Sequence, residues 1–343
     1  MTKDALTRFI GHWLPRVEDE MRAVLHNDEE AVAKHYGMMQ YHLGWMNEQL
    51  KPHISPAGKR LRPMLCLLAC EEMGGDTANA LPAAAAIELL HNFSLLHDDV
   101  EDGDEVRRHR LTVWKVWGIP QAINAGDAMF TLAFAAIQRL NRRGVDAATT
   151  LRVLDIFTQT SLALTEGQHL DIDFEQRPHV TTDEYIRMIQ GKTAALIGAS
   201  VAIGATIAQA TAEKQAILQK FGQNTGLAFQ IQDDILGIWG DPSVTGKAAG
   251  NDVLRRKKSL PILHALAHEQ VGEELQALFA GELNESHLPQ AMALFERADT
   301  RAFAESMLHD YHEQAIDALA EVLGSMDRSV LYALTDSLLY RKA

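Results

Sequence analysis

Hydrophobic and polar positions alternate with helical spacing along most of the chain. From Ala5 to Leu25 large apolar side chains recur every four residues, which predicts an amphipathic helix that Pro15 either kinks or splits. No stretch shows the sustained two-residue alternation of a strand bounded by turn residues. Further helices are expected over residues 30–50, 61–73, 81–101, 119–140, 149–173, 182–189, 193–210 and 212–238, with four or so more between 260 and 340.

No repeat of fixed period and no low-complexity linker interrupts this pattern. The chain has 343 residues, of which 47% are hydrophobic, so a large core is possible. We therefore expect an all-α fold, with residues 1–343 forming a single domain of about a dozen helices. A large helical bundle can hold a site in a central cavity, between side chains of facing helices.

The net charge and the cysteine content limit the classes of function that this chain can have. The net charge of −14 argues against a general nucleic-acid binder, although a local basic pocket remains compatible with it. Cys66 and Cys70 are one helical turn apart in apolar sequence, which predicts buried core residues in a reducing, cytoplasmic setting. The first residues do not resemble a signal peptide, and the longest apolar windows are too short for a membrane segment.

The helix expected over residues 81–101 ends in an acidic group. Asp98 and Asp102 are one turn apart on one face, Asp99 lies between them, and His91 is two turns before Asp98. Stacked carboxylates repel each other unless a cation lies between them. Hard oxygen donors without thiolates favour Mg²⁺ over Zn²⁺. A solvated helix end is the simpler interpretation of one such group alone.

A second acidic pair, Asp233–Asp234, ends the helix expected over residues 212–238. Two acidic pairs in apolar sequence are costly to bury unless cations and anions accompany them. If the two helix ends face each other across a bundle core, they can share a cluster of Mg²⁺ ions.

Basic residues gather near the acidic pairs, often beside glycines or helix starts where backbone N–H groups also favour anions. Lysine attracts phosphate as a point charge, and arginine offers a fork that suits two oxygens. Solvated surface charge is the alternative interpretation for each of them. The groups are Lys59–Arg60–Leu61–Arg62, Arg107–Arg108, Lys192, Lys247 and Arg255–Lys258.

The order of these motifs resembles that of the trans-isoprenyl diphosphate synthases. The resemblance covers about residues 55–261 closely, whereas residues 1–50 match only weakly. It implies an isoprenoid synthase type I fold, usually a homodimer, and head-to-tail condensation of isopentenyl diphosphate with an allylic diphosphate. The matching segments are Gly58–Pro63, His91, Asp98–Asp102, Arg107–Arg108, Lys192–Thr193, Phe229–Asp234, Gly246–Lys247 and Lys257.

The resemblance also implies a role for each position. Three Mg²⁺ ions would be held by Asp98, Asp102 and Asp233, with Asp99 and Asp234 in support. The isopentenyl diphosphate site would comprise Lys59, Arg62, His91 and Arg108, with Arg60 as a further candidate. The allylic diphosphate would be clamped by Arg107, Lys192, Lys247 and Lys257. Thr193 and Gln230 would line the path of the reacting carbons, and Gln168 and Asp171 would form a further supporting pair.

Two departures from the family pattern affect these motifs. Gly237 stands where the second acidic motif usually has its last aspartate, and Asp241 is a candidate for water-mediated support. His109 and Leu111 replace a glycine and a proline in the loop after the first motif, but both arginines of that loop remain. Because Asp233 and Asp234 are kept, we expect an active enzyme.

Product length should depend on what blocks the cavity below the first acidic pair. Phe93 lies five residues before Asp98, roughly 7.5 Å along a helix axis, and its ring can act as a floor. Because its neighbour Ser94 is small, we expect a C20 product, geranylgeranyl diphosphate, with C15 farnesyl diphosphate as the alternative. Core packing is the other interpretation of Phe93.

Two other functions are compatible with acidic helix ends. A class I terpene cyclase would lack a second diphosphate site, so Lys59, Arg62 and Arg108 argue against it. A non-catalytic partner subunit would not need both aspartate pairs.

Overall fold

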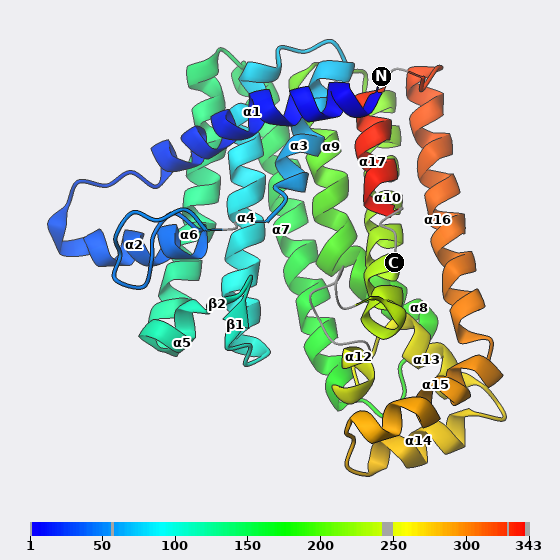
Figure 1. The fold of residues 1–343 in the computed structure, drawn as a ribbon. Helices are drawn as coiled ribbons and strands as arrows, with labels where there is room; N and C mark the ends of the chain where they lie inside the picture. The colour runs from blue at the N-terminus through cyan, green and yellow to red at the C-terminus, as the bar shows by residue number, and fades with distance from the viewer. Residues whose placement is uncertain (1, 56–57, 242–249, 328, 340–343) are drawn as a thin grey trace. The chain divides into compact units, whose positions relative to one another are not determined.

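The computed structural model describes residues 2–55, 58–241, 250–327 and 329–339. Within these ranges the chain is built of helices, and its strands are limited to one short antiparallel pair (Figure 1). The prediction of an all-α protein is therefore confirmed. Two compact units are found, one formed by residues 1–158 and 200–215 and the other by residues 159–199 and 216–343. That the whole chain is one domain around a central cavity stays a prediction.

The first unit is organised around α4 (Leu81–Glu101). Its alanine-rich first half is fully buried, because small side chains allow α1, α3 and α6 to pack closely on it. The other elements are α1 (Thr2–Val24), η1 (Glu30–Val32), α2 (Ala33–His42), α3 (Leu61–Glu72), η2 (Thr77–Ala80), β1 (Val106–Arg107), β2 (Arg110–Leu111), α5 (Val113–Trp117), α6 (Ile119–Gln138), η3 (Arg139–Arg143) and the first part of α7 (Ala147–Gln176).

The second unit has two apolar clusters. One joins α8, α10 and α13 around Tyr185 and Ile231, and the other joins α13, α14 and α15 around Phe295. Three helices, α7, α9 and α10, contribute residues to both units. The elements that follow α7 are α8 (Thr182–Ile189), η4 (Gln190–Ala194), α9 (Ala195–Ile207), α10 (Ala212–Trp239), α12 (Asn251–Leu254), α13 (Leu260–Ala267), α14 (Gly272–Ala280), η5 (Glu285–His287), α15 (Leu288–Arg297), α16 (Thr300–Leu323) and α17 (Val330–Leu339).

Most helix bounds agree with the sequence predictions, and the differences have local causes. Pro15 lies inside one continuous helix, so the split alternative is wrong. The helix predicted over residues 30–50 ends at His42, because Gly44 adopts a positive φ of 86° and the chain then pairs Met46 with Pro52. The loop predicted over residues 103–111 contains the β1–β2 hairpin.

One stretch, Thr182–Ile207, is long and apolar enough to cross a membrane by length and composition. Its apolar window is 78% buried inside the protein. Burial of this extent is typical of a core helix, as the sequence predicted for residues 194–210.

Candidate active site

The end of α4 brings two carboxylates together under one arginine. Arg107, on β1, donates from Nε to Asp99 Oδ1 at 2.5 Å, and its Nη2 lies 3.7 Å from Asp98 Oδ2. Asp99 is 1% exposed, and this burial raises its pKa to about 6 although Arg107 opposes the shift. Asp102 caps the helix one turn later and is exposed to solvent. The structure therefore gathers the first acidic motif and Arg107 as one group.

These carboxylates suit a hard divalent cation. Among the described residues no three His, Cys, Asp or Glu side chains are gathered closely enough to hold a metal by themselves. Mg²⁺ needs only one or two carboxylates, because waters and substrate phosphates complete its shell. Asp98 and Asp102 offer that number of carboxylates, at the last turn and the C-cap of α4. The donor set therefore fits Mg²⁺.

Arg108 lies at the turn of the β1–β2 hairpin. Arg108 and His109 have positive φ values of 52° and 62°, a conformation that usually requires glycine or asparagine. Each such residue costs about 1 kcal/mol or more, and strain of this kind persists only where the surroundings hold it. The Nη1 atom of Arg108 is buried without a partner, and burial with the nearby Arg60 lowers the pKa of its guanidinium to about 10. A cation that is desolvated in this way is stabilised when an anion binds next to it.

His91 and Arg62 lie beside Arg108 in the same unit. Arg62 Nη1 is 3.4 Å from His91 Nε2. Burial and the charges of Arg62 and Arg108 hold the pKa of His91 well below its usual range, so its imidazole is neutral. Gly58, with a positive φ of 83°, passes so close to Arg108 that a Cβ would lie 3.1 Å from its Nη2. This glycine places the exposed Lys59 next to the arginine group.

Arg60 is arranged differently from its neighbours. It is 3% exposed and donates to Glu88 at 2.7 Å, to Glu18 at 2.8 Å and to the Leu43 carbonyl at 3.2 Å. Burial lowers its pKa, but the two glutamates outweigh that effect and leave the pKa raised. Through these contacts the guanidinium of Arg60 joins α1 and α4 to the start of α3. They do not favour the expectation that Arg60 binds a substrate.

In the second unit Lys192 and Asp171 form an ion pair of 2.5 Å between η4 and α7. The η4 turn is a π-helix, a local widening that often occurs at functional sites. A Cβ on Gly167 would lie 2.1 Å from the Lys192 backbone nitrogen, so only glycine allows α7 and η4 to approach this closely. Gln168, the other predicted member of the supporting pair, is half-buried on α7.

A chain of side-chain hydrogen bonds runs from η4 to α13. Thr193 Oγ1 donates to Gln230 Oε1 at 2.9 Å, and Gln230 Nε2 donates to Asp234 Oδ1 at 3.2 Å. Asp234 Oδ2 also accepts from the Tyr185 hydroxyl and from the Leu260 backbone nitrogen. Burial raises the pKa of Asp234 and that of Tyr185, whose hydroxyl is held protonated next to the carboxylate. Asp233, one residue earlier, is half-buried.

Gly237 lies against a second carboxylate. A Cβ at residue 237 would be 2.3 Å from Asp252 Oδ2, so the space that a side chain would enter is already occupied by Asp252. Asp252 is 8% exposed, on α12. Desolvation lowers the pKa of Lys257, but the charges of Asp234 and Asp252 raise it by more, so that its pKa lies above the usual value. Lys247 and Gly246 lie outside the described residues, and Asp241 is exposed.

Phe93 belongs to a row of aromatic rings in the first unit. Its ring centroid is 4.8 Å from that of Phe130, which is 5.1 Å from Phe134, which in turn is 5.1 Å from Phe157. Ser94 is turned back onto its own helix, where it donates to the His91 carbonyl at 2.8 Å. Three further rings therefore extend the row from Phe93, the ring that the sequence predicted as the floor of the cavity.

A family model described as polyprenyl synthetase matches residues 44–295. The chain belongs to the polyprenyl synthetase family. A geranylgeranyl diphosphate synthase of Mycobacterium tuberculosis is 40% identical over 94% of the chain and 92% of its own length. A (2E,6E)-farnesyl diphosphate synthase of Mycobacterium bovis is 40% identical over 85% of the chain and 81% of its own length.

A solved structure shows the same fold. The polyprenyl synthetase of Streptomyces coelicolor A3(2) superposes with a TM-score of 0.87 at 38% identity, covering 98% of this chain and 99% of the other. The match to 94% of the chain by the first relative also reaches into residues 1–50, which the motifs alone left weakly matched.

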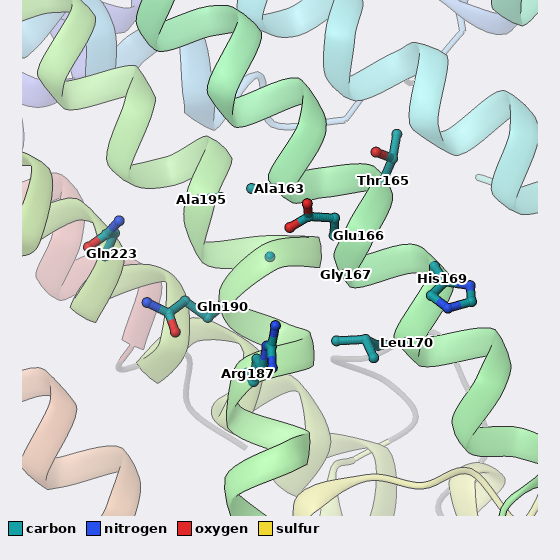
Figure 2. A pocket seen from close by; sticks show the side chains of 11 residues that line it. Ala163, Thr165, Glu166, Gly167, His169, Leu170, Arg187, Gln190, Ala195 and Gln223 are labelled. Atoms are coloured by element: carbon teal, nitrogen blue, oxygen red, sulfur yellow. The ribbon is translucent and has the colours of Figure 1, made fainter.

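A further cavity lies in the second unit (Figure 2). Its volume is about 580 Å³, and its lining residues come from α7, α8, η4, α9 and α10. Glu166 and Arg187 project into it, whereas neither Lys192 nor Asp171 lines it. The cavity is therefore separate from the Lys192–Asp171 ion pair.

Three residues that lie beside the predicted motifs of their own units were not predicted from the sequence. Tyr185 is one apolar position among several on α8, and its bond to Asp234 depends on the packing of α8 against α10. Asp252 is fifteen residues from Gly237, and nothing local links the two. His42 lies in the weakly matched start of the chain, yet its Nε2 is buried near the arginine group.

Proposed function

We propose that this enzyme is a short-chain trans-prenyltransferase that condenses isopentenyl diphosphate with an allylic diphosphate to give geranylgeranyl diphosphate. The observation that carries the proposal is the 40% identity over 94% of the chain with the mycobacterial geranylgeranyl diphosphate synthase. A C15 product is the alternative, because the farnesyl diphosphate synthase relative is equally identical over a smaller share of the chain.

The first unit supplies the isopentenyl diphosphate site in this proposal. Arg108, Arg62 and Lys59 carry the positive charge, and the neutral His91 donates a hydrogen bond to a diphosphate oxygen. The burial that lowers the pKa of the Arg108 guanidinium supports this role, because an anion bound to its N–H groups offsets the cost of desolvation. Arg60 holds the helices beneath this group, through its contacts with Glu18 and Glu88.

The allylic diphosphate is held by Arg107, Lys192, Lys257 and Lys247 in this proposal. Arg107 and Lys192 are now paired with aspartates, and these partners keep both cations oriented before substrate arrives. Asp98, Asp102 and Asp233 would ligate Mg²⁺, which supplies charge neutralisation of the diphosphate when bound. Asp99 and Asp234 support them from buried positions, with Asp234 fixed by Tyr185. Asp252 stands in for the carboxylate that Gly237 lacks.

The proposed reaction begins when the allylic C–O bond breaks and leaves a carbocation and pyrophosphate. Fixed cations lower this barrier because they stabilise the charge that develops on the leaving group. The double bond of isopentenyl diphosphate then attacks the cation, and a proton passes to the bound pyrophosphate. Thr193 fixes the orientation of the Gln230 amide, which lines the path of the reacting carbons. Whether the two acidic pairs face each other stays a prediction.

Two further properties are part of the proposal. We expect a cytoplasmic enzyme, since both cysteines are buried and unpaired. We also expect a homodimer, as is usual for the family that the sequence resembles. Size-exclusion chromatography with light scattering would test the oligomeric state.

The decisive experiment is a direct assay. The purified chain is incubated with Mg²⁺, labelled isopentenyl diphosphate and, in turn, dimethylallyl, geranyl and farnesyl diphosphate. The proposal expects C20 as the main product with every primer that is accepted. Release of cyclic hydrocarbon from an allylic diphosphate alone would support a terpene cyclase. Complete inactivity of the pure chain would support a non-catalytic partner subunit.

A further inference from the structure

A small cavity lies beside the β1–β2 hairpin of the first unit. Its volume is about 20 Å³. Its walls come from the end of α2, the end of α4, the hairpin and the start of α5. The lining residues include Tyr41, His42, Asp99, Arg108, Arg110 and Leu111.

Three lining residues each contribute a buried polar atom without a partner. They are Asp99 Oδ2, Arg108 Nη1 and His42 Nε2. An atom that is buried without a partner loses its hydrogen bonds to water, and the cost is greater when the atom is charged. Each such atom in a native protein calls for an explanation, and three in residues that line one cavity indicate that something occupies it.

Size and chemistry select the occupant. A cavity needs about 10–15 Å³ to hold one water, and the water needs two to four polar partners. A phosphate group is too large for this space, while an apolar guest would leave the three polar atoms unsatisfied. A water can accept from Arg108 and donate to Asp99. It can also either donate to or accept from the neutral imidazole of His42.

We propose that this cavity holds one ordered water that joins Arg108 Nη1, Asp99 Oδ2 and His42 Nε2, and that His42 is thereby a positioning residue for Arg108. The inference rests on the proposed function in one respect, the binding of isopentenyl diphosphate by Arg108. The water holds one arm of the guanidinium and leaves its remaining N–H groups for the substrate.

The end of α2 is already fastened to this hairpin. Arg110 donates to the Tyr41 carbonyl at 2.9 Å and to the Met46 carbonyl at 2.7 Å, and its guanidinium lies 3.9 Å from the Tyr41 ring centroid. The Tyr41 hydroxyl donates to the Leu111 carbonyl at 2.7 Å. These bonds hold the second strand, whereas the strained turn residue Arg108 lacks a partner for its buried Nη1. The water and His42 supply that missing restraint.

A crystal structure of the wild-type enzyme without substrate, at a resolution that shows ordered water, is the first test. We expect one peak within hydrogen-bonding distance of all three atoms. A cavity without density, or density bonded to only one of the three, overturns the proposal.

Steady-state kinetics supply the second test. In His42→Phe the third polar partner is lost and the ring crowds the cavity, so KM for isopentenyl diphosphate should rise about tenfold. KM for the allylic diphosphate should change less than twofold. His42→Gln, whose amide can reach the position of Nε2, should restore most of the loss. Thermal unfolding of each variant identifies any variant that fails to fold. If His42→Phe does not fold, the test rests on the crystal structure and on the kinetics of His42→Gln.

His35→Phe is the matched control, because His35 is also on α2 and does not line the cavity. Equal KM values in His42→Phe and His35→Phe would overturn the positioning role. Arg108→Ala separates this outcome from a failure of the proposed function. If Arg108→Ala leaves KM for isopentenyl diphosphate unchanged, the proposed substrate site is wrong. If it raises that KM while His42→Phe does not, only the role of His42 is wrong.

Discussion

Lys192 Nζ lies 2.5 Å from Asp171 Oδ2, and this ion pair joins the π-helical turn η4 to α7. The pair forms where Gly167 allows the two backbones to touch. Both side chains are about one-quarter exposed, so the charges are partly desolvated and yet open to a ligand. An arrangement of this kind keeps a cation oriented for an incoming diphosphate.

Replacing Lys192 should affect chemistry more than binding. We expect Lys192→Ala to lower kcat about a hundredfold, because the cation stabilises charge that develops on the leaving pyrophosphate. Asp171→Asn should lower kcat less, since the lysine keeps its charge and loses only its orientation. The measurement is steady-state kinetics with both substrates varied. Lys220→Ala, at an exposed position of α10, is the control. A Lys192→Ala enzyme as active as this control would contradict the proposed role.

Arg60 and Arg62 are two residues apart, but their substitution should have different effects. The first should change the stability of the fold and the second the binding of isopentenyl diphosphate. Arg60→Met should destabilise the fold by roughly 3–5 kcal/mol, because it leaves the buried Glu88 carboxylate uncompensated. Arg62→Met should unfold near the wild-type denaturant midpoint but show a raised KM for isopentenyl diphosphate. Urea unfolding and kinetics of the two variants provide the measurement. Equal stability of both variants would show that the Arg60 ion pairs are not structural.

The sequence predicted the helices well because their signals are local. The bounds of α4 and α8 follow from apolar periodicity and, in α4, from a proline near its start. The N-cap of α8 is Thr181, one residue before the predicted Thr182–Glu184 signature. The acidic and basic motifs could also be predicted from the sequence, because groups of charged residues are unusual within apolar helical segments. In the described residues, Arg107 and Lys192 form ion pairs with Asp99 and Asp171, which the sequence also named as site residues.

What the sequence could not show depends on contacts between distant segments. Arg60 and Arg62 look alike in the chain, and only burial against Glu18 and Glu88 separates them. The turn at Arg108–His109 has no glycine, so its positive φ values could not be inferred from turn chemistry. The partner of Gly237 comes from α12, across a segment without any periodic signal.

The neutral histidine at residue 91 should make stability depend on pH. Burial and Arg62 hold the folded pKa of His91 well below the value of about 6.5 expected in the unfolded chain. The unfolded state therefore binds a proton that the folded state does not, and stability present above pH 6.5 is lost as the pH falls below it. In His91→Gln the slope between pH 6.5 and 5 should be flatter by up to about 1.4 kcal/mol per pH unit.

The measurement for His91 is urea unfolding at several pH values. His26→Gln is the control, because the side chain of His26 is 67% exposed. A His91→Gln slope that equals the wild-type slope would show that the folded histidine titrates normally.

Product length should depend on more than one ring. Phe93→Ala should lengthen the product by one or two isoprene units, because it removes the first ring of the row. The Phe130 ring, 4.8 Å away, should then become the floor, so Phe93→Ala with Phe130→Ala should lengthen the product further. Product lengths are read by chromatography of the hydrolysed prenyl alcohols. Phe303→Leu, in the second unit, is the control. An unchanged distribution in both variants would mean that the row is only core packing.

Restoring the aspartate that the second acidic motif usually carries should impair this enzyme. In Gly237→Asp the new side chain must enter space where Asp252 Oδ2 lies 2.3 Å from the Cβ position, and two carboxylates in contact repel each other. We expect kcat to fall about tenfold or more, since each tenfold loss corresponds to only about 1.4 kcal/mol. Asp252→Gly alone should also lower kcat, because it removes the carboxylate. The double variant Gly237→Asp with Asp252→Gly should recover much of the activity, because one carboxylate again occupies the place. Activity of Gly237→Asp at or above the wild-type level would show that Asp252 does not fill the role of the missing residue.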